Sequence, residues 1–492
     1  MTDTASDTGS WRELLGGYLG TSTVLAGGVL LYATTEFLTT SLLPTTVAEI
    51  GGGRLYAWVI TLYLVGSVVA AATVNTLRLR IGACSAFLCG LAVFGIASVV
   101  CAAAPNMPVL IAGRALQGVA GGLLAGLGYS LINIALPRSL WTRGSALVSA
   151  MWGVATLVGP AIGGLFAQFG LWRWAFGAMV VLAALMAILV PRALSNADIV
   201  AGDAPGITKV PVLSLLLLGA AALAVSVAEL PHNAFAMAGL LAAGAALVGL
   251  FIYADWRMSA KALPNSTFGS GPLKWIYLTV GIQMAAVMVD TYVPLFGQRL
   301  AHLTPVAAGF LGAVLAMGWT IAELTSASLS NPRVVDRVIA VAPLVMASGL
   351  VLAAATQRTD APIAVVVVWA IGFLIGGIGM GMTWPHLSMR AMDTVDDPSE
   401  GGAAAAAINT VQLISAAFGA GLAGVVVNNA AGGDLAAARW LYAVIAALAA
   451  TAVVASTRAG RRVVAPADDA LLTKHALCPI RYMSDRHDGR GR

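Results

Sequence analysis

Four ionisable side chains lie inside long apolar stretches of this 492-residue chain, where water cannot stabilise a charge. Glu36, Asp290 and Glu323 lie deep in three of these stretches, and Arg114 lies in a fourth. A charge at the centre of a bilayer costs at least about 2.5–3.5 kcal/mol. A carboxylate removed from water also holds its proton more tightly, so a change in its surroundings can load or release that proton. We therefore predict that the three acids take part in proton coupling.

Each of these residues also has a simpler interpretation, which the sequence leaves open. A buried acid can pair with a polar neighbour or lie in interfacial water at a helix end. Arg114 can extend its long side chain toward the loop at Pro105. A fifth acid, Glu229, is followed closely by Pro231, and we interpret it as a surface residue at a helix end.

The apolar stretches are numerous enough to make the whole chain a membrane protein. Hydrophobic residues make up 59% of it and charged residues 10%, whereas a soluble domain carries about 25% charged residues. A bilayer core about 30 Å thick needs about 20 apolar residues per helix, and such runs follow one another from Thr21 to Thr457. The predicted fold class is an all-α polytopic membrane protein.

Charged, proline-containing and glycine-rich turns divide the chain into about fourteen predicted transmembrane helices, grouped as six, two and six. The predicted spans are 21–43, 57–76, 83–104, 109–133, 144–168, 174–190, 212–230, 235–254, 275–297, 305–329, 338–356, 362–384, 403–427 and 438–457. The predicted domains are a cytoplasmic segment (1–20), a six-helix bundle (21–191), a linker with two extra transmembrane helices (192–274), a second six-helix bundle (275–457) and a basic, disordered cytoplasmic tail (458–492).

The basic residues indicate which side of the membrane each loop faces. If the N-terminus is cytoplasmic, the outer loops contain five of the 27 Lys and Arg residues, and all the others except Arg114 lie in the inner loops and the tail. This asymmetry follows the positive-inside rule. Residues 1–10 contain two acids and no base, which argues against a cleaved signal peptide. We predict a multi-pass protein of the bacterial inner membrane with both termini in the cytoplasm.

The same residues disfavour several functional classes. The net charge of +5 is spread over alternate loops and forms no single patch, so no nucleic-acid partner is expected. The four cysteines have no metal-ligand spacing, so we expect no metal and no other cofactor, with the proton gradient as energy source. The five histidines are scattered over loops and tail, which disfavours a membrane enzyme, and a sensor or scaffold is also disfavoured.

Two motifs in the first predicted bundle carry a resemblance to a known family. The sequence LIAGRALQGVAGG at 110–122 resembles the helix-four signature of the major facilitator superfamily, with Arg114, Gln117 and Gly118 at its positions. The sequence GVATLVGPAIGG at 153–164 resembles the helix-five antiporter motif of the same family. The motif residues of this second stretch are Gly159, Pro160, Gly163 and Gly164.

The resemblance extends to segments typical of drug exporters. The WRWAF at 172–176 resembles the start of their sixth helix, and the linker at 251–268 resembles the one in fourteen-helix drug/proton antiporters. The resemblance implies the major facilitator fold, with two six-helix bundles around a central cavity that opens alternately to each side. It also implies a coupling role for Arg114 and a role for Pro160 as a hinge and a barrier to proton leakage. Close glycines permit tight helix packing, and a proline kinks a helix.

One predicted loop departs from the family pattern. The family has Gly-x-x-x-Asp, then glycine and basic residues, between helices two and three, whereas residues 75–84 here read NTLRLRIGAC. Arg80 and Gly82 are retained, and we predict gating roles for them in a latch that is weak or rebuilt from other residues. The string around Glu36, TEF followed by LLP, is also similar to one in twelve-helix exporters.

A set of aromatic, flexible and polar residues lies on spans expected to face the cavity. Such surfaces accommodate varied apolar ligands, and a carboxylate among aromatic rings favours cationic ones. Ordinary helix packing is the alternative for any single member. The set is Phe37, Thr40, Tyr129, Met151, Trp152, Gln283, Met284, Tyr292, Asn409 and Gln412.

The function that these observations predict is proton-coupled export of amphipathic small molecules by alternating access, as in multidrug efflux. The expected partners are these substrates, protons and membrane lipids, and the protein is expected to act as a monomer. An alternative cargo is an endogenous lipid or a cell-envelope precursor.

Overall fold

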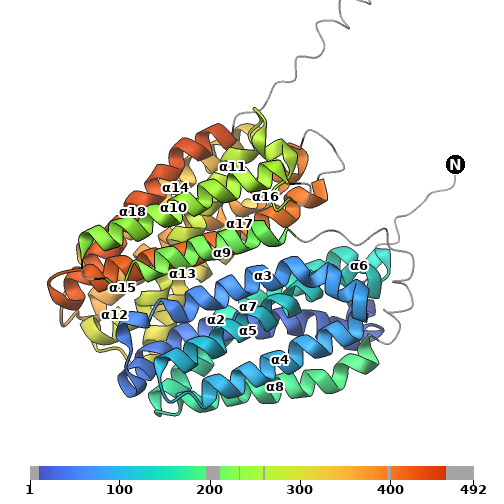
Figure 1. Ribbon diagram of the computed structural model, residues 1–492, viewed down its shortest axis with the longest axis horizontal. Coiled ribbons are helices and arrows are strands. Elements are labelled where there is room, and N and C mark those ends of the chain that lie inside the picture. Colours follow the sequence, from blue (N-terminus) through green and yellow to red (C-terminus); the bar gives the residue numbers. More distant parts are fainter. Residues whose placement is uncertain (1–9, 195–210, 232, 259–260, 396–400, 461–492) are drawn as a thin grey trace, which may run out of the picture.

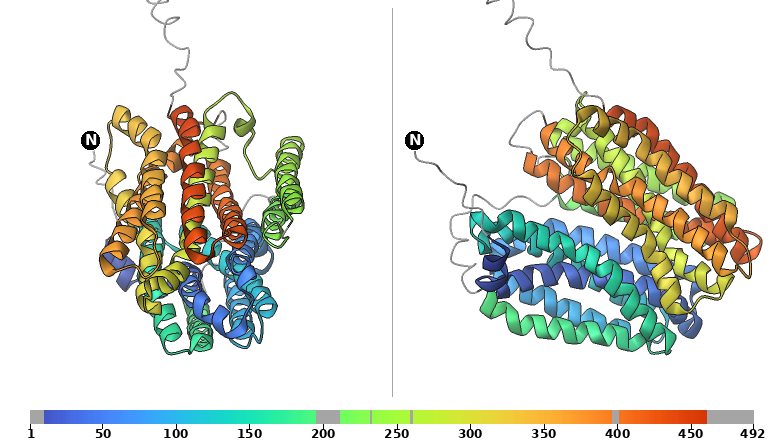
Figure 2. Two further views of the ribbon diagram at one scale, coloured as in Figure 1. Left: turned by 90° about the vertical axis from the view of Figure 1, so that its left-hand side faces the viewer. Right: turned by 180° about the vertical axis from the view of Figure 1, so that it is seen from behind.

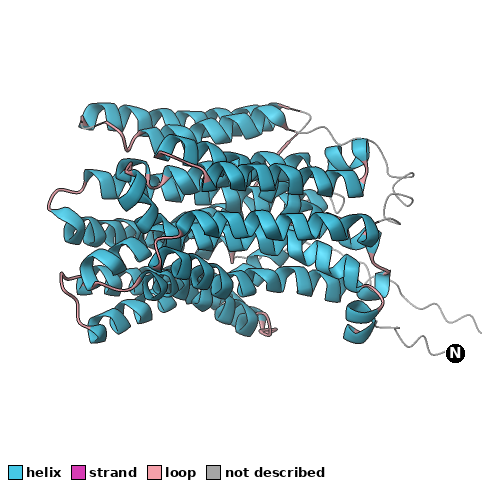
Figure 3. Ribbon diagram, turned by 90° about the horizontal axis from the view of Figure 1, so that it is seen from below, coloured by secondary structure: helices cyan, strands magenta, loops and turns pink. Residues whose placement is uncertain are grey.

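The computed structural model describes residues 10–194, 211–231, 233–258, 261–395 and 401–460. Every regular element in these ranges is a helix (Figure 3). Twelve of the helices are long and apolar enough to cross a membrane. The predicted all-helical, multi-pass fold is therefore confirmed. The tail predicted for 458–492 begins too early, because α18 continues to Ala459, and residues 461–492 lie outside the described residues.

The helices follow the predicted spans closely. Each of the fourteen spans corresponds to one α-helix or to a helix that a short 3-10 turn interrupts. The first group is α1 (Trp11–Gly16), α2 (Leu19–Ile50), η1 (Gly53–Leu55), α3 (Trp58–Ile81), α4 (Ala83–Ala102), α5 (Met107–Ser130), α6 (Ile132–Ala135), η2 (Arg138–Leu140), α7 (Trp141–Gln168) and α8 (Trp172–Ala193).

The second group contains the two inserted helices and the second bundle. Its elements are α9 (Val212–Val227), α10 (Ala234–Arg257), η4 (Asn265–Phe268), α11 (Leu273–Val287), η5 (Met288–Tyr292), α12 (Val293–Ala301), α13 (Pro305–Ser326), α14 (Pro332–Thr356), α15 (Ile363–Gly381), α16 (Trp384–Asp393), α17 (Gly401–Asn429) and α18 (Gly433–Ala459). Two predicted spans, which correspond to α2 and α9, are not among the twelve helices that are long and apolar enough to cross a membrane. The helix α2 is rich in threonine, which lowers its hydropathy, and α9 is short, with 16 residues.

Threonine is tolerated in α2 because the helix itself satisfies four of the hydroxyl groups, although the buried hydroxyl of Thr34 has no partner in the described ranges. The hydroxyls of Thr35, Thr39 and Thr46 each donate to the carbonyl four residues earlier, at distances of 2.7, 2.7 and 3.2 Å. Thr40 donates in the same way to the carbonyl of Glu36, at 3.0 Å. These bonds leave no hydroxyl of this group unpaired in an apolar medium. A polar helix can thus occupy the middle of the molecule.

The predicted span 275–297 is confirmed as part of the membrane-crossing stretch Leu273–Ala301, but a 3-10 turn at Asp290 interrupts its α-helix. The helix α11 ends at Val287, the 3-10 turn η5 covers 288–292, and α12 begins at Val293. Pro294 explains the break, since it has no N–H to donate to the carbonyl of Asp290 and its ring would collide with that carbonyl. The break places Asp290 on an irregular turn in the middle of a transmembrane path.

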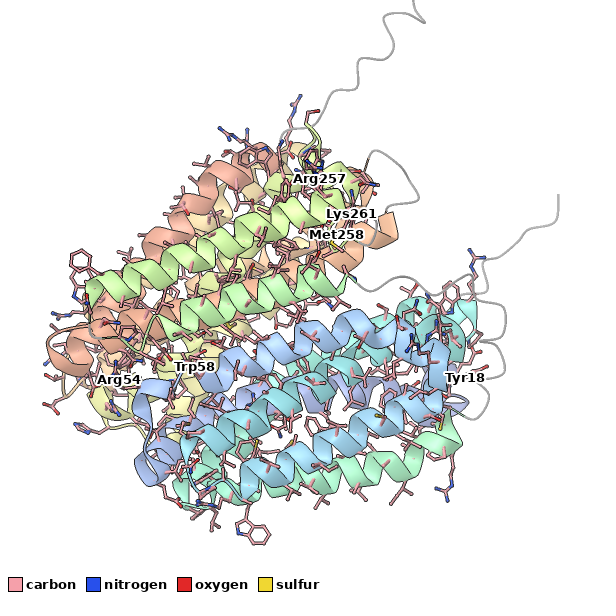
Figure 4. All side chains as sticks on the ribbon, viewed as in Figure 1. Tyr18, Arg54, Trp58, Arg257, Met258 and Lys261 are labelled. Carbon is pink, nitrogen blue, oxygen red and sulfur yellow. The ribbon has the colours of Figure 1, made fainter. Side chains whose placement is uncertain are left out.

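The two groups of helices form two bundles that meet at one end and diverge toward the other (Figure 1; Figure 2, right). Figure 4 labels Arg54 and Trp58 at the end where the bundles meet, which we call the convergent end. Tyr18 and Arg257 are labelled toward the other end, which we call the divergent end. The inserted helices α9 and α10 pack against each other on one flank, and α9 also contacts α3 and α17.

Helices approach closely within each bundle where glycine faces a neighbouring backbone. A Cβ atom on Gly118 or Gly122 would overlap the backbone of Tyr63 or Ser67 on α3. In the second bundle, a Cβ on Gly377 would overlap the carbonyl of Leu315 on α13. Van der Waals packing is the main attraction between helices in lipid, so these contacts contribute directly to stability.

Replacing Gly122 by alanine is expected to destabilise the protein by about 1–3 kcal/mol, because the new methyl group has no space beside Ser67. The measurement is the thermal unfolding midpoint in detergent. Gly239→Ala is the matched control, since Gly239 is also helical and a methyl group there would meet no atom within 4 Å. An equal midpoint for the two variants would contradict the packing role of Gly122.

Candidate functional site

Glu36 and Asp290 approach each other from opposite bundles. Both are partly exposed, and they are near enough for their charges to interact. Asp290, Phe37 and Thr40 line a small cavity of about 10 Å³ together with Pro160 and residues of α13, which is close to the smallest space that holds a water molecule. The two acids therefore lie where the bundles meet.

Neither carboxylate forms an ion pair with a basic residue in the described ranges, although Arg114 acts on Glu36 electrostatically from inside the first bundle. The ion pairs in these ranges all involve other acids. The hydroxyl of Thr291 lies 3.5 Å from Asp290 Oδ1, at the limit of a hydrogen bond. Asp290 therefore has a polar neighbour in Thr291, as the simpler interpretation expects, and neither acid forms an ion pair. The two acids can thus change protonation without breaking a salt bridge.

Arg114 is fully buried inside the first bundle, so the interpretation that it extends toward the Pro105 loop is wrong. Its Nη1 donates to Gln117 Oε1 at 2.9 Å, and its Nε lies 3.4 Å from the carbonyl oxygen of Val59. Its guanidinium lies over the ring of Tyr63, 3.9 Å from the centroid. A cation in an apolar medium needs such partners, and Gln117 of the α5 motif supplies one while Val59 and Tyr63 on α3 supply the others.

Gln117 continues this network across the bundle. Its Nε2 donates to the Ser98 hydroxyl on α4 at 2.7 Å, and the Cys101 thiol lies 3.5 Å from its Oε1. On the other side of Arg114, the Tyr63 hydroxyl donates to the carbonyl of Tyr32 on α2 at 2.8 Å. Because Tyr32 lies one helical turn before Glu36, the network reaches α2 without an ion pair between Arg114 and Glu36.

The second motif, on α7, lies between the two bundles. A Cβ on Gly159 or Gly163 would collide with Phe37 or Leu38 on α2 of the same bundle. Gly164 faces Val306 at the start of α13, in the opposite bundle. Pro160 lies beside Gly309, also on α13. The motif therefore packs the first bundle against the second near the convergent end.

Glu323 lies away from the other two acids, at the other end of α13. Its electrostatic neighbours are Trp319 on its own helix and Tyr129 on α5. The ring of Trp319 in turn lies edge-on to Trp384, with centroids 5.8 Å apart. The structure thus places Glu323 beside predicted cavity residues and outside the Glu36–Asp290 site.

The stretch 75–84, predicted as a loop, is almost wholly helical, because α3 continues to Ile81 and α4 begins at Ala83, and it contains a polar contact that the sequence pattern did not predict. Gly82 has the left-handed φ of 84°, which suits glycine, and it joins α3 to α4. Arg80 is exposed. Arg78 is buried instead, and its Nη2 donates to Asn75 Oδ1 at 2.8 Å. Asn75 replaces the first glycine of the family pattern, so the substitution itself creates this contact.

A charge pair occurs in the corresponding part of the second bundle. Arg390 on α16 pairs with Asp336 on α14 and also approaches the carbonyl of Ala459 on α18, at 3.4 Å. This contact ties three helices of one bundle together at the divergent end. Its two residues are ordinary helix-end charges in the sequence, so spacing alone could not identify the pair.

The predicted cavity residues divide into two groups. Three are buried in packing contacts: Gln283 bonds to Gly379 and Thr383 at 3.2 and 3.1 Å, Met284 is enclosed, and the ring of Tyr292 stacks on Tyr56. The others are partly or largely exposed and include Phe37, Thr40, Tyr129, Met151, Trp152, Asn409 and Gln412. Trp152 lies edge-on to Tyr32, one turn from Glu36.

Glu229 is fully buried, so its interpretation as a surface residue is wrong. It follows the end of α9, and its carboxylate is enclosed by α3 and α17. No group of three His, Cys, Asp or Glu residues arranged to hold a metal occurs in the part of the chain that the structure describes.

Comparison with known proteins places this geometry in a family. The Major Facilitator Superfamily model matches residues 25–420. The chain is 70% identical over 465 residues to a protein of Mycobacterium tuberculosis (strain ATCC 25618 / H37Rv) named "Probable multidrug-efflux transporter", covering 94% of this chain and 99% of that protein. It is 26% identical over 400 residues to the multidrug transporter protein MdtP of Bacillus subtilis (strain 168), covering 79% of this chain and 72% of that protein.

The fold is similar to solved structures at low sequence identity. A D-xylose-proton symporter aligns with a TM-score of 0.64 and 14% identity, covering 91% of this chain and all of that chain. This similarity supports the two-bundle architecture.

Replacing Gln117 by leucine is expected to destabilise the protein by about 1.5–3 kcal/mol, because Arg114 then loses its charged hydrogen bond inside the bundle. Thermal unfolding in detergent measures the effect. Ser149→Ala is the control, since it removes only an exposed 3.5 Å contact with Tyr129. A Gln117→Leu variant as stable as the control would show that the network does not hold Arg114.

Proposed function

Because this chain belongs to the major facilitator superfamily, we propose that it is a proton-driven antiporter that exports amphipathic small molecules, as multidrug efflux pumps do. The names of its relatives in Mycobacterium tuberculosis and Bacillus subtilis support multidrug export. The proton coupling rests on the Glu36–Asp290 site. A family of transporters also fits a protein that is not an enzyme.

The observation that carries this proposal is the pair of acids that opposite bundles bring together, with neither acid in an ion pair in the described ranges. Glu36 comes from α2 and Asp290 from η5, so any movement of one bundle against the other changes the surroundings of both. Hydration favours the ionised form of a carboxylate, and an apolar enclosure favours the protonated form. Bundle movement and proton binding are thereby linked in one site.

The loops at the two ends support an orientation of the protein in the membrane. The basic residues Arg257 and Lys261 lie at the divergent end (Figure 4), and positively charged loops face the cytoplasm. We therefore assign the divergent end and both termini to the cytoplasm, in the inner membrane of a bacterium. The conformation shown is then closed on the outer side, with the α7 motif packed against α13.

One cycle follows from this assignment. Protons from the outer medium bind Glu36 or Asp290 when the convergent end is open, and the bundles then close over the neutral acids. Opening on the cytoplasmic side hydrates the acids, releases the protons and admits the substrate. Each proton contributes about 2.3 kcal/mol per 100 mV of membrane potential, which supports export against a moderate gradient.

The surface near Glu36 is suited to flat, cationic or amphipathic molecules. Trp152, Met151 and Phe37 supply aromatic and flexible apolar contacts and are partly exposed. A nearby carboxylate adds attraction for a positive charge. We propose that a single chain carries out this cycle, since both bundles and the site between them belong to one molecule.

The test uses purified protein in liposomes that contain a pH-sensitive dye. Ethidium added outside should enter in exchange for protons, so the lumen becomes more alkaline. Asp290→Asn and Glu36→Gln should each slow this change by at least about tenfold, because neither amide can carry a proton. Asp434→Asn, which changes an exposed acid paired with Arg299, should leave the rate unchanged.

The same experiment can refute the coupling assignment. If both amide variants exchange ethidium for protons at the wild-type rate, the two acids do not carry the coupled proton. If ethidium moves in the wild type without any pH change, transport is not antiport with protons.

A further inference from the structure

Glu229 is a buried acid that the coupling scheme does not use. It follows α9, the first of the two inserted helices, and none of its surface is exposed. Its Oε1 is buried and has no hydrogen-bond partner in the described ranges. An ionised carboxylate with an unpaired oxygen is strongly disfavoured away from water. The enclosed state therefore suits a neutral, protonated Glu229.

The residues around Glu229 come from both bundles. From the second bundle, Gly424 on α17 faces its carboxylate so closely that a Cβ there would overlap Oε2. That same Cβ would lie 2.8 Å from the Cβ of Ala57, at the start of α3 in the first bundle. Asn428, one turn later on α17, has its Nδ2 3.4 Å from Glu229 Oε2. Glu229 thus fills a joint between the bundles.

Arg54 of η1 is the basic residue that interacts electrostatically with the Glu229 carboxylate. The hydrogen bonds that its guanidinium donates here are accepted by backbone carbonyls. Its Nη2 donates to the carbonyls of Glu229 and Leu230, at 3.4 and 2.5 Å. Asn428 Nδ2 in turn donates to the Arg54 carbonyl at 2.9 Å. Arg54 and Trp58 mark this position in Figure 4, at the convergent end.

The remaining neighbours are aromatic and supply few polar contacts. The indole of Trp58 faces Glu229, but its N–H makes no hydrogen bond of good geometry. Tyr292 of η5 lies close enough to interact electrostatically with Glu229, and its ring stacks on Tyr56 with centroids 4.8 Å apart. Both tyrosine hydroxyls are buried and unpaired in the described ranges. The surroundings therefore offer little stabilisation to an ionised carboxylate.

We propose that Glu229 is a second proton-binding site, contributed by the inserted helices, which takes up one proton from the outer medium each time the convergent end closes. Parting of α3 from α17 would expose the carboxylate to water, and it would then return the proton to the same side. Each proton that Glu229 takes up on closing is released to the same side on opening. This site therefore carries no net proton across the membrane and does not change the number of protons transported per substrate. It makes closure of the outer side depend on outer pH.

The sign of this dependence follows from linkage. The closed state holds the proton and the open state releases it, so low pH stabilises closure and rising pH favours opening. One proton can change the ratio of open to closed molecules by at most about tenfold per pH unit. The inference rests on the alternating bundle movement of the proposed function, but not on proton coupling through Glu36 or Asp290.

The test measures the distance between spin labels on the two bundles at the convergent end. Cysteines introduced at the exposed positions Phe169 and Ile363 carry the labels, in a chain whose native cysteines are replaced and which carries Glu36→Gln and Asp290→Asn. In lipid nanodiscs without a gradient, the open population should rise at least about tenfold between acidic and mildly alkaline buffer, a change within the limit for one proton. Glu229→Gln should stay closed throughout, whereas Glu229→Asp should keep the pH dependence.

The control is Glu49→Gln, which changes an exposed acid at the same end that pairs with Arg173 inside the first bundle, and it should behave as the parent. If Glu229→Gln does not fold, Gly424→Ala is the substitute variant. The methyl group of the alanine would displace the Glu229 carboxylate, so the open population in acidic buffer should rise. A pH response unchanged in Glu229→Gln, or in Gly424→Ala, overturns the inference. Because Glu36 and Asp290 are already neutralised, failure of the proposed coupling leaves this result interpretable.

Discussion

The structure depends on one constraint, which is that a charge inside a bilayer needs either a partner or a function. Arg114 satisfies the constraint by partners, since Gln117, Val59 and Tyr63 surround its guanidinium. Glu36 and Asp290 form no ion pair in the described ranges, and they lie where the two bundles meet. The same arrangement that leaves these acids unpaired makes them sensitive to every relative movement of the bundles.

Small residues make that movement possible. Within each bundle, glycines such as Gly122 and Gly377 lock neighbouring helices together, so the bundle moves as a unit. Between the bundles, Gly164 and Gly309 bring α7 and α13 into contact near the convergent end. This contact is built from small side chains, whereas the joint around Glu229 also contains the stacked rings of Tyr56 and Tyr292. Tight bundles that meet at separate joints are what an alternating-access mechanism requires.

The sequence predicted the helices and the acids of the site, because both are properties of local composition. The sequence did not predict the 3-10 turn at Asp290. Pro294 lies four residues later, but a proline inside an apolar run can also kink a helix without breaking it. The burial of Glu229 and of Gln283 could not be predicted, since each depends on which helix packs beside it. The contact between Arg78 and Asn75 was missed because the family pattern points to Arg80.

The central claim is that a proton gradient drives the substrate through the Glu36–Asp290 site. The direct measurement imposes a pH gradient on liposomes that contain the protein and equal ethidium on both sides, with the membrane potential held at zero by potassium and valinomycin. Ethidium should accumulate on the acidic side, and a protonophore should abolish the accumulation. Ethidium that stays equally distributed despite the gradient would contradict it.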